Sequence, residues 1–333
     1  MKKFVKPFSL LLAAGLLVLS GCGNESSSGQ GNKETFKVGI TQFVEHPSLD
    51  AATEGFKKAM EDAGFKDGDN VEYNFQNAQA DMNNTQTIAN NFVGDKVDLI
   101  FANATPSAVS ALNATKDIPI VFTSVTDPIG AELVESFEKP GANITGTTDN
   151  HPDGTEKTIK FIVEEAGAKT IGVIYNAGEQ NSEVQVAQVK ELAAKFGATV
   201  VEASISTSAE VKQGAESLVG RVDAIYVPTD NTVVSALESV IAVANNEKIP
   251  LFVGELDSMA RGAIAASGFD YFELGYQSGK MAADILKGNK KPSEIPVELP
   301  NSLTLMINKN AAEAQGLEVK QEWENIAEFY EGE

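Results

Sequence analysis

From residue 36 onward, short runs of β-branched, aliphatic and aromatic residues alternate with longer amphipathic segments. In the longer segments the apolar residues recur at helical spacing, as in the stretch from Ala52 to Ala63 and again from Tyr271 to Lys287. The short runs lack a polar face, which is typical of strands buried on both sides in a parallel sheet. The alternation therefore predicts an α/β fold with mostly parallel sheets. The predicted strands are Phe36–Ile40, Val97–Phe101, Ile118–Phe122, Ile171–Tyr175, Asp223–Val227 and Ile249–Val253.

The strand and helix pattern occurs twice. A Val-Asp pair opens a strand at residue 97 and again at 222, and Val-Ser-Ala-Leu follows at 109 and again at 234, so both elements are displaced by 125 residues (97 to 222, and 109 to 234). An Ile-Pro pair then precedes a strand in each half. The order of elements predicts two similar Rossmann-like lobes. A ligand would bind between them, beyond the carboxyl ends of the strands.

The pattern also predicts how the chain is divided. We expect residues 36–145 and 271–297 to form the first lobe, and residues 146–270 and 298–333 the second. The segment 139–146 is rich in Pro and Gly, and the region of Pro296 to Pro300 offers another place to cross between lobes. The prediction is a hinge of several strands.

The N-terminal segment has the order of a bacterial lipoprotein signal. Three lysines lie within the first six residues, and an apolar stretch too short to span a bilayer follows. Small residues then stand directly before Cys22, the only cysteine. Because a single cysteine cannot form an internal disulfide, and this one stands in a polar stretch, we interpret Cys22 as the lipidated first mature residue and not as a buried thiol. Residues 1–21 are then a signal peptide and 22–35 a flexible tether. The interpretation predicts an exported protein, lipid-anchored to the outer face of the cell membrane.

Composition narrows the class of function. The formal charge is −21, and loss of the three leader lysines makes it −24, so the surface repels nucleic acid and anionic lipids. We found no phosphate-binding loop, nucleophile elbow or dinucleotide fingerprint in the sequence. Two histidines and one cysteine make a zinc site improbable. The sequence gives no reason to expect an enzyme, a cofactor or a metal.

Five short motifs, in this order, resemble those of the substrate-binding lipoproteins of ABC transporters of the tryptophan/tyrosine type. The resemblance implies the type I periplasmic-binding-protein fold and a mechanism in which two lobes close on a solute. It implies an ABC permease and its ATPase subunits as partners, with an amino acid, aromatic in this family, as the ligand. The chain would act as a monomer. The motifs are Glu45-His46-Pro47-Ser48-Leu49-Asp50, Asn103-Ala104-Thr105-Pro106-Ser107, Asn143-Ile144-Thr145-Gly146, Pro228-Thr229-Asp230-Asn231-Thr232 and Glu273-Leu274-Gly275-Tyr276-Gln277-Ser278-Gly279.

Candidate ligand contacts are the polar and aromatic residues that follow the predicted strands, where both lobes expose groups to the cleft. Phe43 and the strand-end tyrosines could form an apolar wall around an aromatic side chain. Glu179 is interpreted instead as a solvated surface charge. The predicted ligand-binding residues are Gln42, Phe43, His46, Thr105, Ser124, Thr126, Asn150, Asn176, Asn181, Ser182, Thr229, Asp230, Asn231 and Glu255.

Several of these residues have a structural alternative. Thr105 precedes Pro106 and fits a helix N-terminus equally well as a cap or as a ligand contact. Asp230 stands at the equivalent place in the repeat, where it could cap a helix or bind the ammonium group of an amino acid. The ligand hypothesis predicts that Asp230→Ala weakens binding strongly and leaves the melting temperature nearly unchanged.

Three functions remain open. The preferred one is solute capture for an ABC importer, with a branched-chain or other small amphipathic solute as the alternative ligand. The second is a surface sensor or adhesin on the same scaffold. The third is an enzyme without a known signature.

Overall fold

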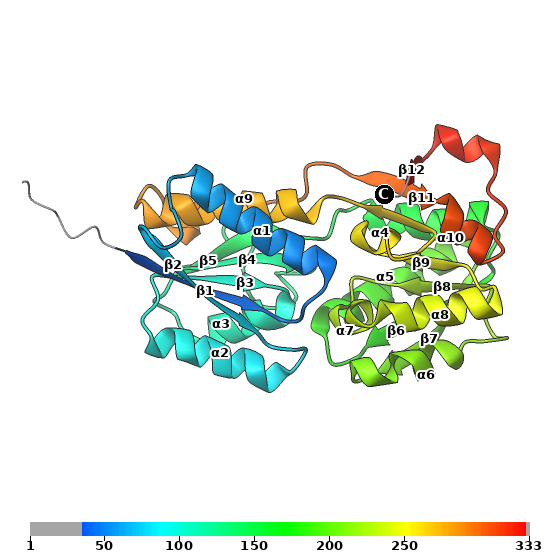
Figure 1. The fold of residues 1–333 in the computed structure, drawn as a ribbon, viewed down its shortest axis with the longest axis horizontal. Helices are drawn as coiled ribbons and strands as arrows, with labels where there is room; N and C mark the ends of the chain where they lie inside the picture. The colour runs from blue at the N-terminus through cyan, green and yellow to red at the C-terminus, as the bar shows by residue number, and fades with distance from the viewer. Residues whose placement is uncertain (1–34, 331–333) are drawn as a thin grey trace, which may run out of the picture. The chain divides into compact units, whose positions relative to one another are not determined.

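The computed structural model describes residues 35–330, which belong to one compact unit built around two sheets. The first sheet is entirely parallel, with the strand order β2-β1-β3-β4-β5 (Figure 1). The strands predicted at residues 36, 97 and 118 are present, two of them beginning two residues later. The five strands are β1 (Phe36–Gln42), β2 (Val71–Asn77), β3 (Leu99–Asn103), β4 (Ile120–Val125) and β5 (Ile144–Thr148).

The second sheet repeats the topology of the first. Its order is β12-β11-β10-β9-β8-β6-β7, so β6 to β10 are arranged as β1 to β5 are, and β11 is antiparallel to β10. This shared order confirms the prediction of two similar α/β lobes. The strands are β6 (Thr170–Asn176), β7 (Thr199–Ile205), β8 (Ala224–Val227), β9 (Leu251–Val253), β10 (Ala265–Gly268), β11 (Thr304–Asn308) and β12 (Glu328–Tyr330).

Helices cover both faces of the first sheet (Figure 1). α1 (Pro47–Asp62) and α9 (Tyr271–Leu286) pack together on one face, over a core that includes Phe56 and Met60. α2 (Met82–Gly94) and α3 (Thr105–Ala114) cover the other face. α9 follows β10 of the second sheet in sequence, yet it packs on the first. The first lobe is therefore built from two separate parts of the chain.

The second sheet is covered in the same way. On one face, α4 (Gly154–Lys160), a π-helical turn (Phe161–Glu165), α5 (Gln180–Phe196) and α10 (Lys309–Ala314) pack around the buried Trp323. On the other lie α6 (Val211–Glu216), α7 (Asn231–Ser235) and α8 (Leu237–Glu247). Short 3₁₀ turns occur at Ser208–Glu210, Asp257–Met259, Pro292–Glu294 and Gln321–Asn325.

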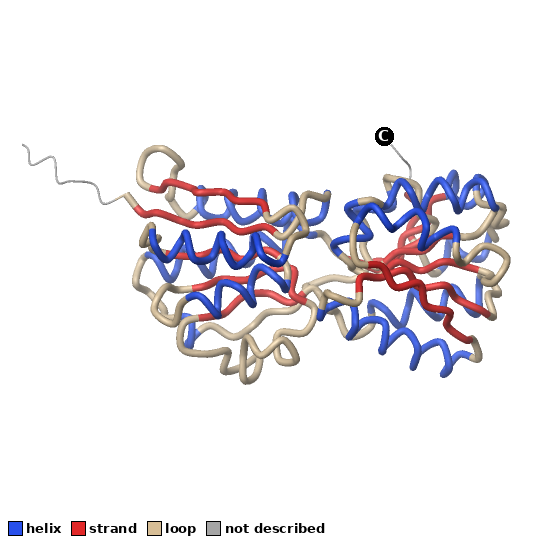
Figure 2. The backbone as a smooth tube through the Cα atoms, turned by 90° about the horizontal axis from the view of Figure 1, so that it is seen from below, coloured by secondary structure: helices blue, strands red, loops and turns tan. Residues whose placement is uncertain are grey.

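Three segments of the chain link the lobes, at 149–153, 269–270 and 299–303, and Figure 2 shows them as loops between the two sets of strands. The third runs beside the first, because Glu298, just before the third segment, forms a parallel bridge with Thr147 near the end of β5. Such a hinge allows the lobes to open and close about a cleft between the carboxyl ends of their strands.

Within residues 35–330 no helix is long and apolar enough to cross a membrane. The same part of the chain contains no cluster of His, Cys, Asp and Glu side chains that could hold a metal ion. The predicted signal peptide, Cys22 and nearly all of the tether lie outside the described residues.

Candidate ligand-binding cleft

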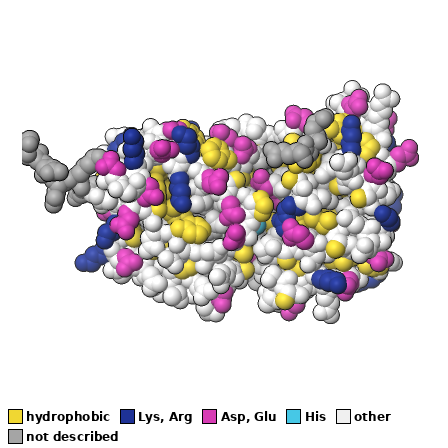
Figure 3. Space-filling view, viewed as in Figure 1, with side chains coloured by type: hydrophobic (Ala, Val, Ile, Leu, Met, Phe, Trp, Pro, Cys, Tyr) yellow, Lys and Arg dark blue, Asp and Glu magenta, His cyan; other side chains and the backbone are white. Residues whose placement is uncertain are grey.

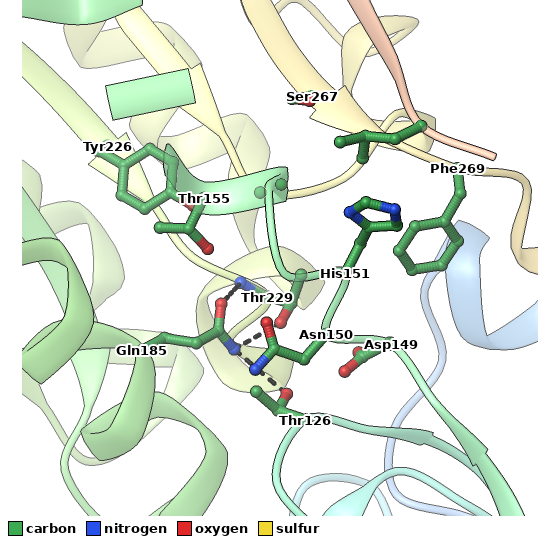
Figure 4. A pocket seen from close by; sticks show the side chains of 13 residues that line it. Thr126, Asp149, Asn150, His151, Thr155, Gln185, Tyr226, Thr229, Ser267 and Phe269 are labelled. Carbon is green, nitrogen blue, oxygen red and sulfur yellow. Dashed lines mark hydrogen bonds between the residues drawn. The ribbon is translucent and has the colours of Figure 1, made fainter. Parts of the chain in front are cut away.

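Two neighbouring pockets lie between the lobes. The hinge-side pocket is lined by the first linking segment, by Phe269 of the second and by Leu303 of the third (Figure 4). The α1-side pocket lies beside the start of α1. Asp149 and Thr229 line both pockets. The cavity volumes are small, about 20 Å³ on the hinge side and about 10 Å³ beside α1, which is room for about one water molecule each.

Direct hydrogen bonds connect the lobes around these pockets. Gln185 of α5 donates from Nε2 to the hydroxyl of Thr126, which follows β4, at 3.3 Å (Figure 4). Two further bonds start near the N-terminus of α1, where Ser48 Oγ donates to Glu255 Oε2 at 3.1 Å and His46 Nε2 lies 3.4 Å from Asn231 Oδ1. The lobes are therefore in contact on both sides of the cleft.

Four pocket-lining side chains contain buried polar atoms that have no hydrogen-bond partner within the protein. They are two hydroxyls, Ser124 Oγ and Ser267 Oγ, together with His46 Nδ1 and Asp149 Oδ1. A buried polar group without a partner costs roughly 1–3 kcal/mol. Gathered around one cleft, these atoms indicate a place where a polar ligand completes the hydrogen bonding.

Asp149 is the only carboxylate that borders both pockets. It directly follows β5 and accepts a hydrogen bond at Oδ2 from the phenol of Tyr271, 3.0 Å away at the start of α9. Burial raises the pKa of the Asp149 carboxyl, and hydrogen bonds from Thr126 and Tyr271 oppose this shift. An ammonium group beside Oδ1 would favour the ionised form in the same way that a salt-bridge partner does.

Ser124 adds a backbone feature to the cleft. Its φ angle is +55°, in the left-handed region that a serine seldom occupies, and it lies near the end of β4. Such a conformation costs on the order of 1–3 kcal/mol and is found most often at functional sites. It turns the chain at the point where Ser124 meets the α1-side pocket.

Half of the predicted ligand-binding residues line the pockets. The structure brings these residues together from both lobes, although their positions span more than 200 residues of sequence. Thr126, Asn150 and Thr229 line the hinge-side pocket, and His46, Ser124, Thr229, Asn231 and Glu255 line the α1-side pocket.

Asp230 lies behind the pocket wall, where its carboxylate caps α7. Oδ1 accepts from the Val233 N–H at 2.8 Å, and Oδ2 accepts from the Asn176 N–H and the Ser182 hydroxyl, both at 2.6 Å. Burial raises the pKa of Asp230, and the hydrogen bonds oppose that shift. Since both oxygens are occupied and the residue borders neither pocket, the structure supports the capping alternative for Asp230.

Glu179 is fully buried, so its interpretation as a solvated surface charge is wrong. Its carboxylate accepts from Asn231 Nδ2 at 2.6 Å, from the Thr232 hydroxyl at 2.7 Å and from the Thr232 N–H at 3.0 Å. Burial and the nearby charge of Asp230 raise the pKa of Glu179 to about 7. The carboxylate thus holds the N-terminal turn of α7 against β6, which a count of acidic residues could not reveal.

The other predicted residues support the pocket walls without lining them. Phe43 belongs to the core of the first lobe, so it forms no part of an apolar wall around the ligand. Thr105 is the first residue of α3, where it makes no capping bond, because Ala104 occupies the cap position. Gln42, Asn176, Asn181 and Ser182 hydrogen-bond to neighbouring side chains or backbone.

Sequence reasoning missed several lining residues, among them Asp149, Ser267, Phe269 and Tyr271. Asp149 directly follows β5, and the other three lie in β10 or shortly after it. Both strands are short and were not predicted. The available signal was the position of Asp149 next to the predicted Asn150. Gln185 was missed for a different reason, since it lies one turn inside α5, beyond the residues that follow a strand.

Comparison with known proteins identifies relatives along most of the chain. Residues 37–328 match the family model described as ABC transporter substrate binding protein. A tyrosine-binding protein of Clostridioides difficile (strain R20291) is 48% identical over 324 residues, which cover 94% of this chain and 93% of the relative.

Two solved structures show how the lobes are positioned. An ABC domain from Streptococcus pneumonia in complex with L-Trp is 34% identical, with a TM-score of 0.84 over 89% of this chain and 99% of that one. A ligand-free, open substrate-binding protein with adhesive properties from Clostridium difficile is 47% identical, yet its TM-score is 0.65 over 90% of this chain and 100% of that one. The lower score at the higher identity indicates that the lobes lie more as in the L-Trp complex than as in the open structure.

Proposed function

The chain belongs to the ABC transporter substrate-binding protein family, and from this premise we propose that it captures an aromatic amino acid between its lobes. The tyrosine-binding relative and the L-Trp complex support this ligand class. Closure of the lobes on the ligand would create the form that the permease recognises.

The observation that carries the proposal is the position of Asp149. Its Oδ1 is shielded from solvent and has no hydrogen-bond partner within the protein, and the residue borders both pockets. An anion in this position suits the ammonium group of an amino acid, because hydrogen bonds between charged partners are about twice as strong as neutral ones. Asp149 takes the role that sequence reasoning had considered for Asp230.

The same cleft offers groups for the rest of an amino acid. The unpartnered hydroxyls of Ser124 and Ser267 can donate to a carboxylate. Phe269, Tyr271 and Leu49 line the pockets with apolar surface on which an aromatic ring can pack. We propose that these residues, with Asp149, form the binding site. Neutral hydroxyls, together with Asp149 as the lining carboxylate that has an unpartnered oxygen, match a zwitterion better than a ligand of net charge.

The proposal extends to the cellular setting. We propose that Cys22 carries lipid and holds the mature protein at the outer face of the cell membrane, next to an ABC permease and its ATPase subunits. The order of lysines, apolar residues and small residues before Cys22 supports this proposal. We propose that the protein acts as a monomer, binds no cofactor and has no enzymatic activity, as the family's transport role suggests.

A thermal-shift panel tests the ligand class. The protein is residues 35–333, and the ligands are tyrosine, tryptophan, phenylalanine, leucine, isoleucine and two sugars at matched concentrations. A true ligand raises the melting temperature in proportion to the logarithm of its concentration over its dissociation constant. We expect the largest shifts with aromatic amino acids. A larger shift with leucine, isoleucine or a sugar contradicts the proposed ligand class.

A further inference from the structure

His46 lines the α1-side pocket and contains a buried ring nitrogen without a hydrogen-bond partner. His46 directly precedes α1, and its side chain is buried. Leu49, Val234 and Tyr271 line the same pocket. Nε2 of His46 faces Asn231 Oδ1 of the second lobe at 3.4 Å, whereas Nδ1 has no partner within the protein. Which of these two nitrogens carries a hydrogen decides whether a ligand must donate or accept a hydrogen bond at His46.

The neighbours of His46 assign its proton. Asn231 donates from Nδ2 to the buried carboxylate of Glu179 at 2.6 Å, which fixes the orientation of the Asn231 amide. Oδ1 of Asn231 then faces His46, and since an amide oxygen can only accept, Nε2 of His46 must carry the hydrogen. Burial also lowers the pKa of His46 to about 4, so the ring holds one proton at neutral pH. Nδ1 is therefore an unprotonated acceptor.

An acceptor in this position requires a donor from the ligand. Asp149 borders both pockets, so an amino acid whose ammonium binds there would direct its side chain along Leu49 and Val234 towards the α1-side pocket, which must widen to admit a ring because its cavity volume is about 10 Å³. The phenol of tyrosine and the indole N–H of tryptophan each offer a donor on the ring. Phenylalanine has none, and it would leave Nδ1 buried without a partner, at a cost of roughly 1–3 kcal/mol.

We propose that His46 Nδ1 is the specificity-determining acceptor of the cleft, selecting aromatic amino acids that carry a hydrogen-bond donor on the ring and discriminating against phenylalanine. The relay from Glu179 through Asn231 holds His46 in the required tautomer. This assignment rests on the proposed function and names the subset of aromatic ligands that the same site accepts. Sites built to bond a polar group of the ligand are known to reject analogues that lack it.

The test compares dissociation constants of tyrosine, tryptophan and phenylalanine, measured by titration calorimetry on residues 35–333. We expect tyrosine and tryptophan to bind at least about tenfold more tightly than phenylalanine, the effect of one unsatisfied buried acceptor. His46→Gln keeps an N–H that can donate to Asn231 and removes the ring Nδ1. In this variant the preference should fall to about twofold or less, while the fold is retained.

Ser48→Ala is the matched control. It removes a different bond between the lobes, the one to Glu255, from the wall of the same pocket. It should weaken all three ligands alike and leave their ratio unchanged, because His46 is untouched. The assignment is overturned if the wild-type protein binds phenylalanine as tightly as tyrosine, or if His46→Gln retains the full preference. Failure of all three amino acids to bind would instead contradict the proposed function itself.

Discussion

The phenol of Tyr271 donates a hydrogen bond to Oδ2 of Asp149, 3.0 Å away, and so joins the first linking segment to the start of α9, directly after the second linking segment. Acidic side chains are spread over the visible surface of both lobes (Figure 3). Asp149 differs from exposed acidic residues because its Oδ1 is shielded from water and has no hydrogen-bond partner within the protein. A ligand that bonds to its free oxygen therefore acts directly on the part of the fold that bends during closure.

Asp149→Asn should weaken amino-acid binding by roughly 10- to 100-fold, because the variant keeps the size of the side chain and loses a hydrogen bond between charged groups worth about 1.5–3 kcal/mol. Titration calorimetry with tyrosine measures the loss. Asp153→Asn is the matched control, since this aspartate lies in the same linking segment, is exposed and borders neither pocket. Equal affinities of the wild-type and Asp149→Asn proteins would remove Asp149 from the site.

Asp230→Ala should destabilise the fold and not act on the ligand directly. The variant removes the cap of α7, worth about 1 kcal/mol, and leaves the buried donors of Asn176, Ser182 and Val233 without an acceptor. We expect the free energy of unfolding in urea to fall by roughly 2 kcal/mol or more. The sequence-based prediction was the reverse, with binding lost at an unchanged melting temperature. That result would restore a ligand role for Asp230.

The packing of α1 against α9 depends on Gly275. A Cβ at this position would overlap the backbone carbonyl of Ala52, which cannot move without disturbing α1. Gly275→Ala should therefore lower the free energy of unfolding by about 3 kcal/mol, at the upper end of the usual cost of overpacking. Gly94→Ala is the control, because a Cβ there meets only open space at the end of α2. This second variant should be neutral or more stable by up to about 1 kcal/mol.

The position of each strand in its sheet explains which strands could be predicted from the sequence. β1, β3, β4, β6, β8 and β9 lie inside the sheets and read as unbroken apolar runs. β2 and β7 are edge strands with several exposed positions, so their sequences contain polar residues and lack the unbroken apolar run of an interior strand. β5 and β10 are short and rich in Thr, Gly, Ala and Ser, so packing in the sheet and pairing with adjacent strands decide their structure more than residue type does.

The site was predictable to the same degree. Residues after the recognised strands, such as His46 and Thr229, line the pockets, because the carboxyl ends of parallel strands meet at the cleft. Asp149 and Tyr271 follow or adjoin the unrecognised strands and escaped notice. Asp230 shows the converse limit, since a strand-end aspartate can cap a helix or face a ligand, and only its hydrogen bonds distinguish the two roles.

His46 should make stability depend on pH. Burial lowers the pKa of His46 from 6.5 to about 4, so the folded protein binds fewer protons than the unfolded chain between these values. The contribution of His46 to stability is complete above pH 6.5 and is lost as the pH falls towards 4. Between pH 6.5 and about pH 5 this loss amounts to roughly 2 kcal/mol.

Comparison with His46→Gln isolates this effect. The pKa of Glu179 is raised to about 7, so its contribution is complete below pH 4.5 and declines as the pH rises through 7, in both proteins alike. The change in the free energy of unfolding in urea from about pH 7 to pH 5 should therefore be less favourable in the wild-type protein than in the variant, by roughly 2 kcal/mol. Identical changes in the two proteins would mean that His46 is protonated equally in the folded and unfolded chains.

Cys22→Ser tests whether a single anchor keeps the receptor beside its importer. An acidic chain has no electrostatic attraction to an anionic membrane, so the proposed lipid on Cys22 would hold it there by burial of acyl chains. The variant should appear in the medium as a folded protein with unchanged affinity for its amino acid, while cells take up less of that amino acid. Fractionation with an antibody, calorimetry on the released protein and uptake of labelled ligand measure the three effects. Full retention of the variant at the cell surface would contradict the anchor, and undiminished uptake despite release would show that the importer does not need its receptor held nearby.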